Sequence, residues 1–343
     1  MKPKNFKSVI MLTAVLATAA VFSACKGNEP SVGVDVYAAG YGKTENGLST
    51  AKLWKNNVGT NLTDGSNGRG EAFSVFVSGN NVYVAGYEGK YAVLWKNGVA
   101  TNLTDGSKNA AANCVVVSGS DVYVAGYEGD YAVLWKNGVE QKLSDNTSFV
   151  NQAFSVVVSG SNVYVGGSQN KKAALWKNGV LTTLSDGNGG NAWDGTPFND
   201  EARSVFVSGN DVYVAITEMV GLSSIATLWK NGVKTQLSSD VNYDAAAYSV
   251  YVLGNDVYVA GYDDNSSTNF WKNGTWQKLA DDGYGSMTWS VFALGSDIYV
   301  AGAACPVYPG YLYASIWKNG EMQYLSDNGY KAERAYSVFV VKK

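Results

Sequence analysis

The side chains that could act as acids, bases or nucleophiles are limited in kind, because this 343-residue chain contains no histidine. Serine–histidine–aspartate and cysteine–histidine devices are therefore excluded, as are histidine-based zinc or copper sites. A glycoside hydrolase or lyase would have to use a pair of carboxylates, held roughly 5 to 10 Å apart in hydrolases. Four carboxylates are candidates by position, with Asp194 and Glu201 the nominated pair: Asp194, Asp200, Glu201 and Asp244.

Aromatic and arginine side chains form a second group of candidates, suited to binding instead of catalysis. Aromatic faces can stack on a sugar ring, and guanidinium groups bind carboxylate or sulfate. The residues nominated for binding are Trp193, Arg203, Tyr248, Trp289, Tyr336 and Arg69. Alternatives remain for each kind: the aromatics could serve blade packing, Trp193 could cap an edge, and Arg203 and Arg334 could pair with the adjacent Glu201 and Glu333.

The elements that position these residues follow from a repeat counted on its tryptophan. Its seven copies lie 40 to 53 residues apart, at Trp54, Trp95, Trp135, Trp176, Trp229, Trp271 and Trp317. Periods of this size are typical of propellers and solenoids. Each copy consists of short Val-, Tyr- and Phe-rich runs bounded by Gly, Asn, Asp and Ser, and no apolar stripe at helical spacing occurs after the leader. The repeat unit is therefore all β.

One unit predicts four strands, A to D, over residues 72–78, 81–87, 91–96 and 99–104. Strands A and B, and strands C and D, are joined by short Gly- and Asn-containing hairpin turns. These turns hardly vary among the copies, whereas the B-to-C and D-to-A connections carry nearly all the length differences. We name the two ends of the blades the constant face and the variable face, and expect binding on the variable face.

The ends of the chain predict how the array closes. The first copy lacks strand A, while the last copy ends after a strand A at residues 335–341, which would complete the first blade beside Tyr37. Such closure removes exposed edges. The sequence thus predicts an all-β, seven-bladed propeller of four-stranded antiparallel blades. The residue just before the strand-A serine should form a ring at the channel mouth: Phe73, Asn113, Phe154, Arg203, Tyr248, Trp289 and Tyr336.

The repeat resembles those of kelch-type propellers and of bacterial β-propeller repeats. The likeness rests on Val163-Tyr164-Val165-Gly166-Gly167 and on Ser-Gly-Asn-Asp-Val-Tyr-Val-Ala at 208–215, and it covers nearly all of the mature chain. Most copies differ from kelch repeats in having Ala-Gly where kelch has paired glycines. The resemblance implies a propeller and leaves function open, since kelch-like propellers include protein-binding scaffolds, sugar-binding modules and enzymes.

The first 25 residues read as a lipoprotein signal peptide. A basic start and an apolar run from Val9 to Val21 precede Phe22-Ser23-Ala24-Cys25, which resembles a bacterial lipobox with Cys25 as the lipidated residue. An ordinary secretory signal is the alternative. Residues 26–32 then form a tether and 33–343 the propeller. We expect an exported protein, lipid-anchored to a bacterial membrane, either the outer membrane or the cell surface.

Composition narrows the partners. A net charge of −3 without a concentrated basic face argues against nucleic acid. Cys114 and Cys305 lie four blades apart, so a disulfide between them is not expected. No cofactor or metal is expected, since residues 186–191 lack the spacing of a calcium loop. The leading hypothesis is a monomeric, non-catalytic binding module for a glycan or protein. A carboxylate-dependent glycoside hydrolase or lyase and a structural subunit of an envelope complex are the alternatives.

Overall fold

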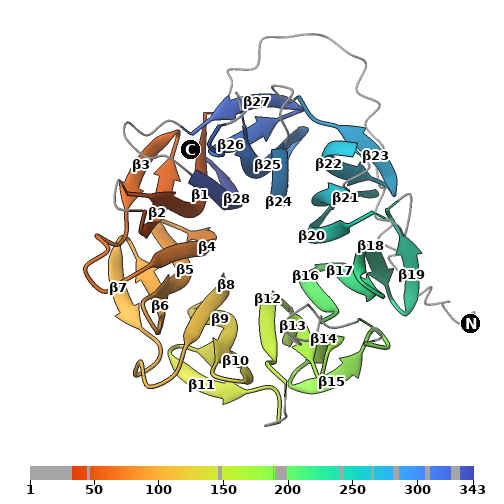
Figure 1. The fold of residues 1–343 in the computed structure, drawn as a ribbon, viewed down its shortest axis with the longest axis horizontal. Coiled ribbons are helices and arrows are strands. Elements are labelled where there is room, and N and C mark those ends of the chain that lie inside the picture. Colours follow the sequence, from red (N-terminus) through yellow and green to blue (C-terminus); the bar gives the residue numbers. More distant parts are fainter. Residues whose placement is uncertain are drawn as a thin grey trace, which may run out of the picture. The chain divides into compact units, whose positions relative to one another are not determined.

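Short runs of Val, Tyr, Phe and Trp, interrupted by Gly and Asn, form 28 strands in the described part of the chain. In this computed structural model the described residues are 33–44, 47–145, 149–187, 189, 199–238, 243–263, 266–280, 286–305, 310–325 and 333–343. They contain no helix, and Val34–Lys343 is one compact unit. The strands form seven four-stranded antiparallel sheets arranged as blades around a central axis (Figure 1). The predicted all-β, seven-bladed propeller is confirmed.

Each blade runs from strand A at the axis to strand D at the rim. Blade 1 is β28 (Glu333–Lys342), β1 (Val34–Lys43), β2 (Ser49–Lys55) and β3 (Val58–Asn61). Blade 2 is β4 (Gly70–Ser78), β5 (Asn81–Glu88), β6 (Tyr91–Lys96) and β7 (Val99–Asn102). Blade 3 is β8 (Ala110–Ser118), β9 (Asp121–Glu128), β10 (Tyr131–Lys136) and β11 (Val139–Lys142). Blade 4 is β12 (Gln152–Ser159), β13 (Asn162–Gln169), β14 (Lys172–Lys177) and β15 (Val180–Thr183).

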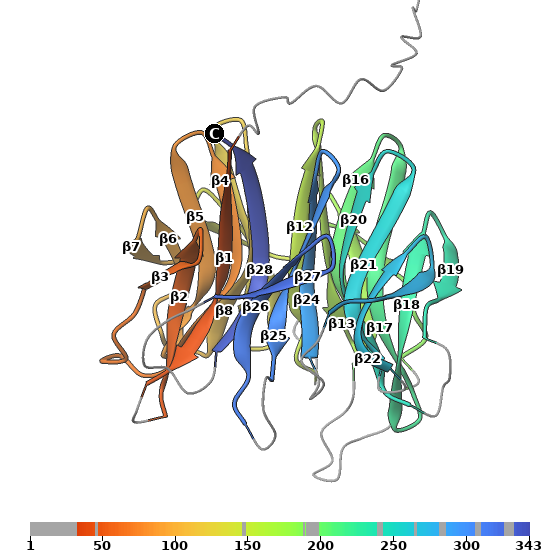
Figure 2. The ribbon, with the colours of Figure 1, turned by 90° about the horizontal axis from the view of Figure 1, so that it is seen from above.

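The remaining three blades follow the same order. Blade 5 is β16 (Glu201–Ser208), β17 (Asp211–Val220), β18 (Ser223–Lys230) and β19 (Val233–Gln236). Blade 6 is β20 (Ala245–Leu253), β21 (Asp256–Asp263), β22 (Ser266–Lys272) and β23 (Thr275–Lys278). Blade 7 is β24 (Ser286–Leu294), β25 (Asp297–Ala304), β26 (Tyr313–Lys318) and β27 (Glu321–Tyr324). Seen from the side, the strands stand roughly along the axis, and the C-terminal end of β28 lies at one face of the ring (Figure 2).

The side chains of the Lys-Asn-Gly turns between strands C and D bind the start of strand B. In blade 3, Asn137 has a φ of 52°, which a hairpin turn of this kind requires. Its Oδ1 accepts from the Val122 N–H at 2.8 Å, and its Nδ2 donates to Asp121 at 2.9 Å. Lys136 binds Asp121 at 2.7 Å and lies over the Tyr123 ring at 5.2 Å. The constant face is therefore held together by side chains as well as by turn geometry.

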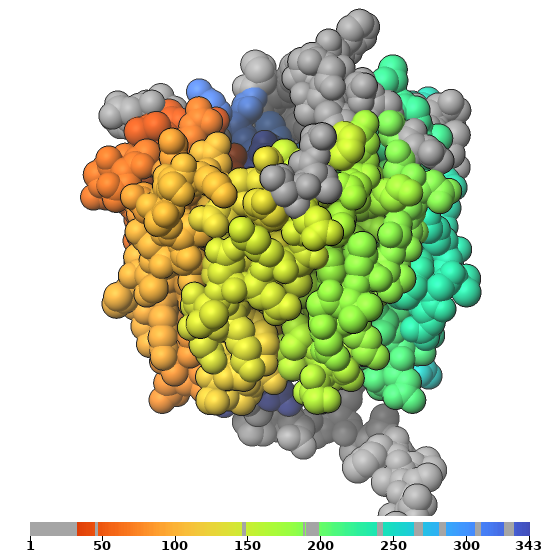
Figure 3. Space-filling model, turned by 90° about the horizontal axis from the view of Figure 1, so that it is seen from below, coloured from red at the N-terminus to blue at the C-terminus, as the bar shows by residue number. Residues whose placement is uncertain are grey.

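The repeat tryptophans fill the space between consecutive blades. Trp95, for example, is fully buried against Tyr37, Ala39 and Ala51 of the preceding blade. Six of the seven are buried at 0 or 1% exposure, and Trp229 is partly buried against the cluster that joins blades 4 and 5. Figure 3 shows the result from outside the ring, where successive blades lie directly against one another as adjoining bands of colour. The prediction that these tryptophans are structural agrees with their burial.

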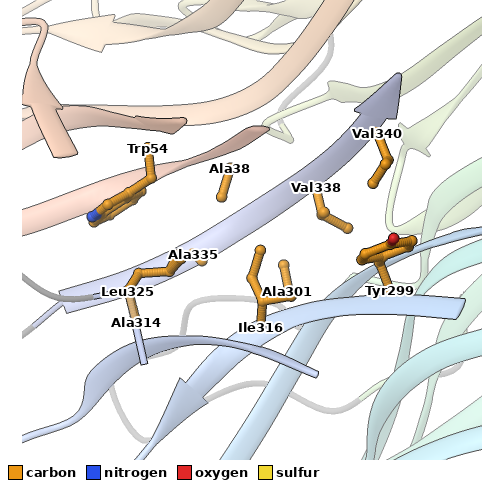
Figure 4. Close-up of a cluster of buried hydrophobic side chains, with 10 residues drawn as sticks. All are labelled: Ala38, Trp54, Tyr299, Ala301, Ala314, Ile316, Leu325, Ala335, Val338 and Val340. Carbon is orange, nitrogen blue, oxygen red and sulfur yellow. The ribbon is translucent and has the colours of Figure 1, made fainter. Parts of the chain in front are cut away.

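The ring closes as the sequence predicts. Strand β28 pairs antiparallel with β1, in a register that joins Tyr37 to Phe339 and Ala38 to Val338. Val338 and Val340 pack with Trp54 and with Tyr299 and Ile316 of blade 7 (Figure 4). The last strand of the chain therefore completes blade 1 and also forms its contact with blade 7.

A buried ion pair lies at this junction, and the sequence analysis did not predict it. Lys52 Nζ of β2 lies 2.9 Å from Glu333 Oε1 of β28, with side-chain exposures of 0% and 2%. In blade 3 the corresponding positions are Ala110 and Val133, both in one apolar cluster. Glu333, which the sequence suggested as a partner for Arg334, thus forms an ion pair with Lys52.

Candidate functional site

All seven innermost strands carry a β-bulge at the same repeat position. In blade 2, Ala72 pairs with Gly86 and Ser74 with Ala85, so Phe73 is the extra residue. The same interruption occurs in the other blades. A bulge turns its extra side chain away from the normal alternation. It also explains the Ala-Gly of the repeat, because a Cβ on Gly86 would lie 2.0 Å from the carbonyl oxygen of Glu71.

The serine after each bulge links its blade to the next one. Ser74 Oγ accepts from the Val115 N–H at 3.2 Å, and Ser155 Oγ accepts from the Val205 N–H at 3.1 Å. Four more serines accept the equivalent bond from a valine N–H of the next blade: Ser204, Ser249, Ser290 and Ser337. Cys114 replaces the serine in blade 3, and its thiol lies 3.8 Å from the Val156 carbonyl oxygen. These bonds fix the bulges relative to one another around the axis.

The seven bulge residues line one cavity at the axis. Its volume is about 640 Å³, and it opens toward the variable face, since Gly89 and Asn109 of the B-to-C and D-to-A connections also line it. The bulge residues in its wall are Phe73, Asn113, Phe154, Arg203, Tyr248, Trp289 and Tyr336, with Arg334, Tyr87, Tyr127 and Gln152 beside them. The ring predicted from the repeat is therefore present, and it is the wall of a concave site.

The aromatic bulge residues contact their neighbours and remain only partly buried. The Tyr336 ring lies 5.6 Å from Phe73 and 5.2 Å from Trp289, with the latter pair edge to face. These are ordinary separations for aromatic pairs. Packing and an accessible aromatic surface are thus combined in the same residues.

Both cavity arginines are held by aromatic rings. The Arg203 guanidinium lies 4.6 Å from the centre of the Phe154 ring and 5.4 Å from that of Tyr248. Arg334 lies 5.5 Å from the Trp289 ring. Arg203 also forms an ion pair with Glu201, as the sequence alternative anticipated. Contacts of this kind restrict a guanidinium group while leaving part of its hydrogen-bonding edge available.

Burial changes the acid–base properties of the site. It raises the pKa of Glu71 above its usual value, against the effect of hydrogen bonds from Tyr87 and Tyr336. Burial likewise raises the pKa of Glu201, although the Arg203 guanidinium lowers it. The pKa of Tyr248 is raised to about 12 by burial. Tyr248 is therefore a neutral hydroxyl near pH 7, able to donate a hydrogen bond.

A second aromatic group was missed in the sequence. Five rings from consecutive blades form an unbroken arc, with centroids 4.8 to 5.1 Å apart, in the order Phe206, Tyr251, Phe292, Phe339 and Phe76. Each follows its bulge residue by three positions, roughly 10 Å along the strand. An aromatic residue three positions after the bulge residue recurs in these five repeats, and this is a sequence signal that could have revealed the arc. The arc lines the axis further from the variable face than the cavity wall.

The other nominated residues are placed as follows. Arg69 is exposed and is not among the cavity-lining residues. Asp200 accepts hydrogen bonds from the Gly187 and Met219 N–H groups, and Asp244 accepts one from Ser224. Of the nominated carboxylate pair, Glu201 is bound to Arg203, and Asp194 lies outside the described residues, as do Trp193 and Cys25.

Several further observations are limited to the described residues. They contain no cluster of three or more potential metal-ligating Cys, Asp or Glu side chains. They include no helix with the length and apolar character needed to span a membrane. No disulfide joins Cys114 to Cys305.

Comparisons with known proteins support the fold alone. No family model and no curated protein sequence matches the chain. A puromycin-hydrolyzing peptidase of Mycobacterium tuberculosis is similar in structure, with a TM-score of 0.53 and 12% identity, over 87% of this chain and 52% of that one. The extracellular domain of a protein named as a hybrid two-component system from B. thetaiotaomicron has a TM-score of 0.50 and 12% identity, over 77% and 37%. This chain thus spans about half or less of each, and the class it shares with them is the β-propeller.

Proposed function

We propose that this protein is a non-catalytic binding propeller that holds a saccharide in the variable-face cavity. This proposal is supported by the lining of the cavity. One bulge residue from every blade lines it, and five of these seven residues are aromatic. The cavity volume, about 640 Å³, lies in the range of small-molecule sites. The apolar faces of a sugar ring pack well on such side chains. A concave wall of this kind favours a saccharide over a protein as the ligand.

Membrane attachment is the second part of the proposal. The sequence Phe22-Ser23-Ala24-Cys25 supports cleavage before Cys25 and acylation of its thiol. The protein would then be a kelch-like lipoprotein of the outer membrane or cell surface. Intact-mass analysis of the mature protein should show an N-terminal, lipid-modified Cys25. An unmodified Cys25, or cleavage at another position, would refute the anchor.

Binding can be tested with the chain from residue 27 onward, since Val34–Lys343 forms a compact unit. A glycan array followed by calorimetry should identify a saccharide ligand. Trp289→Ala should weaken its binding about tenfold, because an aromatic surface in the cavity is lost. Trp276→Ala is the matched control, since Trp276 is 40% exposed on the outer strand β23 and does not line the cavity.

The outcomes separate the alternatives. If no saccharide binds and one envelope protein co-purifies at a fixed ratio, the chain is a structural subunit instead. If the saccharide is cleaved and Glu201→Gln or Asp194→Asn abolishes the cleavage, the chain is a glycoside hydrolase or lyase. Equal binding by wild type and Trp289→Ala would place the ligand away from the cavity.

A further inference from the structure

The charge of the cavity wall is one-sided. Its described lining residues include two arginines, Arg203 and Arg334, and no aspartate or glutamate. Two acidic side chains contact residues of this wall without lining the cavity. Glu201 pairs with Arg203, and Glu71 accepts a hydrogen bond from the Tyr336 hydroxyl at 3.3 Å and interacts electrostatically with Arg334. The charged side chains that line the cavity itself are therefore the two arginines.

The pairing of Arg203 with Glu201 leaves part of its hydrogen-bonding capacity unused. Glu201 contacts the Nη2 atom, and 33% of the Arg203 side chain is exposed. The Nε–H is buried, so the donors that a ligand can reach are the exposed N–H groups on the Nη atoms. A guanidinium group has five N–H donors in a planar fork. Glu201 thus orients Arg203 without saturating it, and the flanking Phe154 and Tyr248 rings hold its plane.

The two arginines flank one sector of the ring. Arg203 belongs to blade 5 and Arg334 to blade 1, and the two blades between them contribute Tyr248 and Trp289 to the wall. Both guanidinium groups act electrostatically on the Tyr248 hydroxyl. The positive charge and a neutral hydroxyl donor are therefore concentrated in the sector that also presents the Trp289 ring.

The opposite sector is uncharged. Blades 2 to 4 contribute Phe73, Asn113, Phe154 and Gln152 to the wall. The Asn113 amide is fixed in place by its donation to the Ala153 carbonyl oxygen at 2.9 Å. Amide and aromatic groups suit the hydroxyls and apolar faces of a neutral sugar, so the wall has one anion-binding side and one neutral side.

We propose that the ligand is an acidic saccharide, with its carboxylate or sulfate group bound in the sector between Arg203 and Arg334. This inference rests on the proposed saccharide-binding function and specifies its ligand class. Charge-assisted hydrogen bonds from guanidinium groups are stronger than neutral ones and favour planar or tetrahedral oxyanions. The neutral remainder of the sugar lies toward Phe73, Asn113 and Gln152.

Calorimetry with paired probes tests this. Trigalacturonic acid and its methyl ester share the same sugar backbone, and the ester replaces each charged carboxylate by a neutral group that carries an added methyl. A sulfated galactose disaccharide and its desulfated form test sulfate. We expect one acidic probe to bind at least about tenfold more tightly than its neutral partner. Its affinity should fall as NaCl rises from about 50 to about 500 mM, because the charges are screened. The probe that binds identifies carboxylate or sulfate as the recognised group.

Variants then connect the preference to the arginines. Arg334→Gln should abolish the preference for the acidic probe, whereas Arg69→Gln, an exposed arginine that does not line the cavity, should leave it intact. If Arg334→Gln lowers the melting temperature, Arg334→Lys keeps the charge and removes the planar fork, and should reduce the preference. The salt dependence of acidic-probe binding is measured on the wild-type protein, so it tests the inference even if both variants are destabilised.

The failures are distinguishable. Equal binding of acidic and neutral probes, or a preference that survives Arg334→Gln, would overturn this inference and leave the saccharide-binding function standing. Binding of neutral saccharides alone would likewise overturn the preference for an acidic saccharide and leave the saccharide-binding function standing. Absence of binding to every saccharide would overturn the proposed function itself.

Discussion

The buried pair of Lys52 and Glu333 makes the closing strand sensitive to single substitutions. Removing one partner leaves the other charge buried, because both side chains are at most 2% exposed. Loss of one member of such a pair costs about 3 to 5 kcal/mol. We therefore expect Lys52→Met and Glu333→Leu each to lower the free energy of unfolding by that amount.

The double variant should behave differently. An apolar pair of similar volume removes both desolvation costs, and such replacements are neutral or stabilising by about 1 to 4 kcal/mol. Blade 3 shows that the repeat accepts this solution, since Ala110 and Val133 are packed in one apolar cluster there. The two substitutions together should thus restore at least the wild-type stability. The coupling energy then equals the sum of the two single losses, about 6 kcal/mol or more.

Equilibrium unfolding in guanidinium chloride, followed by tryptophan fluorescence, measures all four proteins of this cycle. The corresponding pair of substitutions in blade 3, Ala110→Gly and Val133→Ala, provides a control in which no charge is involved. Its coupling energy should be well below that of the ion pair. Additive effects of Lys52→Met and Glu333→Leu would show that the ion pair does not control the stability of the junction.

Two further predictions concern bonds that recur around the ring. Ser74→Ala should lower the free energy of unfolding by about 1 to 3 kcal/mol, because the Val115 N–H loses its acceptor; Cys114→Ser, which restores the usual repeat residue, should cause no such loss, and equal losses in urea titrations would contradict this. Asp35 has its pKa lowered to about 2 by hydrogen bonds from Asn56 and then Lys55, so its contribution is complete above the unfolded pKa of about 3.8 and is lost as pH falls toward about 2. In Asp35→Asn the melting temperature should therefore depend less steeply on pH between pH 4 and 2. An unchanged slope would contradict a stabilising role for the ionised Asp35 carboxylate.

The fold was predictable because its signals are local and repeated. The strand bounds of residues 72–104 follow from apolar runs between Gly and Asn turns, and they differ from the structure by two residues at most. Closure by residues 335–341 was also predictable, since the fragments at the two ends are complementary. Both inferences use only the order of residues within the repeat units.

The site was predictable in part. The repeat position of Trp289 and Tyr336 locates the cavity wall, because seven equivalent residues on seven equivalent strands must surround one axis. The sequence analysis nominated Arg69 for binding and did not nominate Arg334, yet Arg334 lines the cavity and Arg69 does not. Arg334 lies within β28 beside its bulge residue, whereas Arg69 precedes β4. The pairing of Lys52 with Glu333 was invisible, since it joins residues 281 apart in the chain.

The position of β28 has a consequence for how the protein is made. Ala38 and Val338 are partners across three hundred residues, so blade 1 cannot be completed until the segment that contains Val338 has been synthesised. Until then the nascent chain presents an unpaired edge on β1, and such edges promote aggregation. Loss of a few residues from the end of β28 should therefore reduce the yield of soluble protein more than a comparable deletion in any loop.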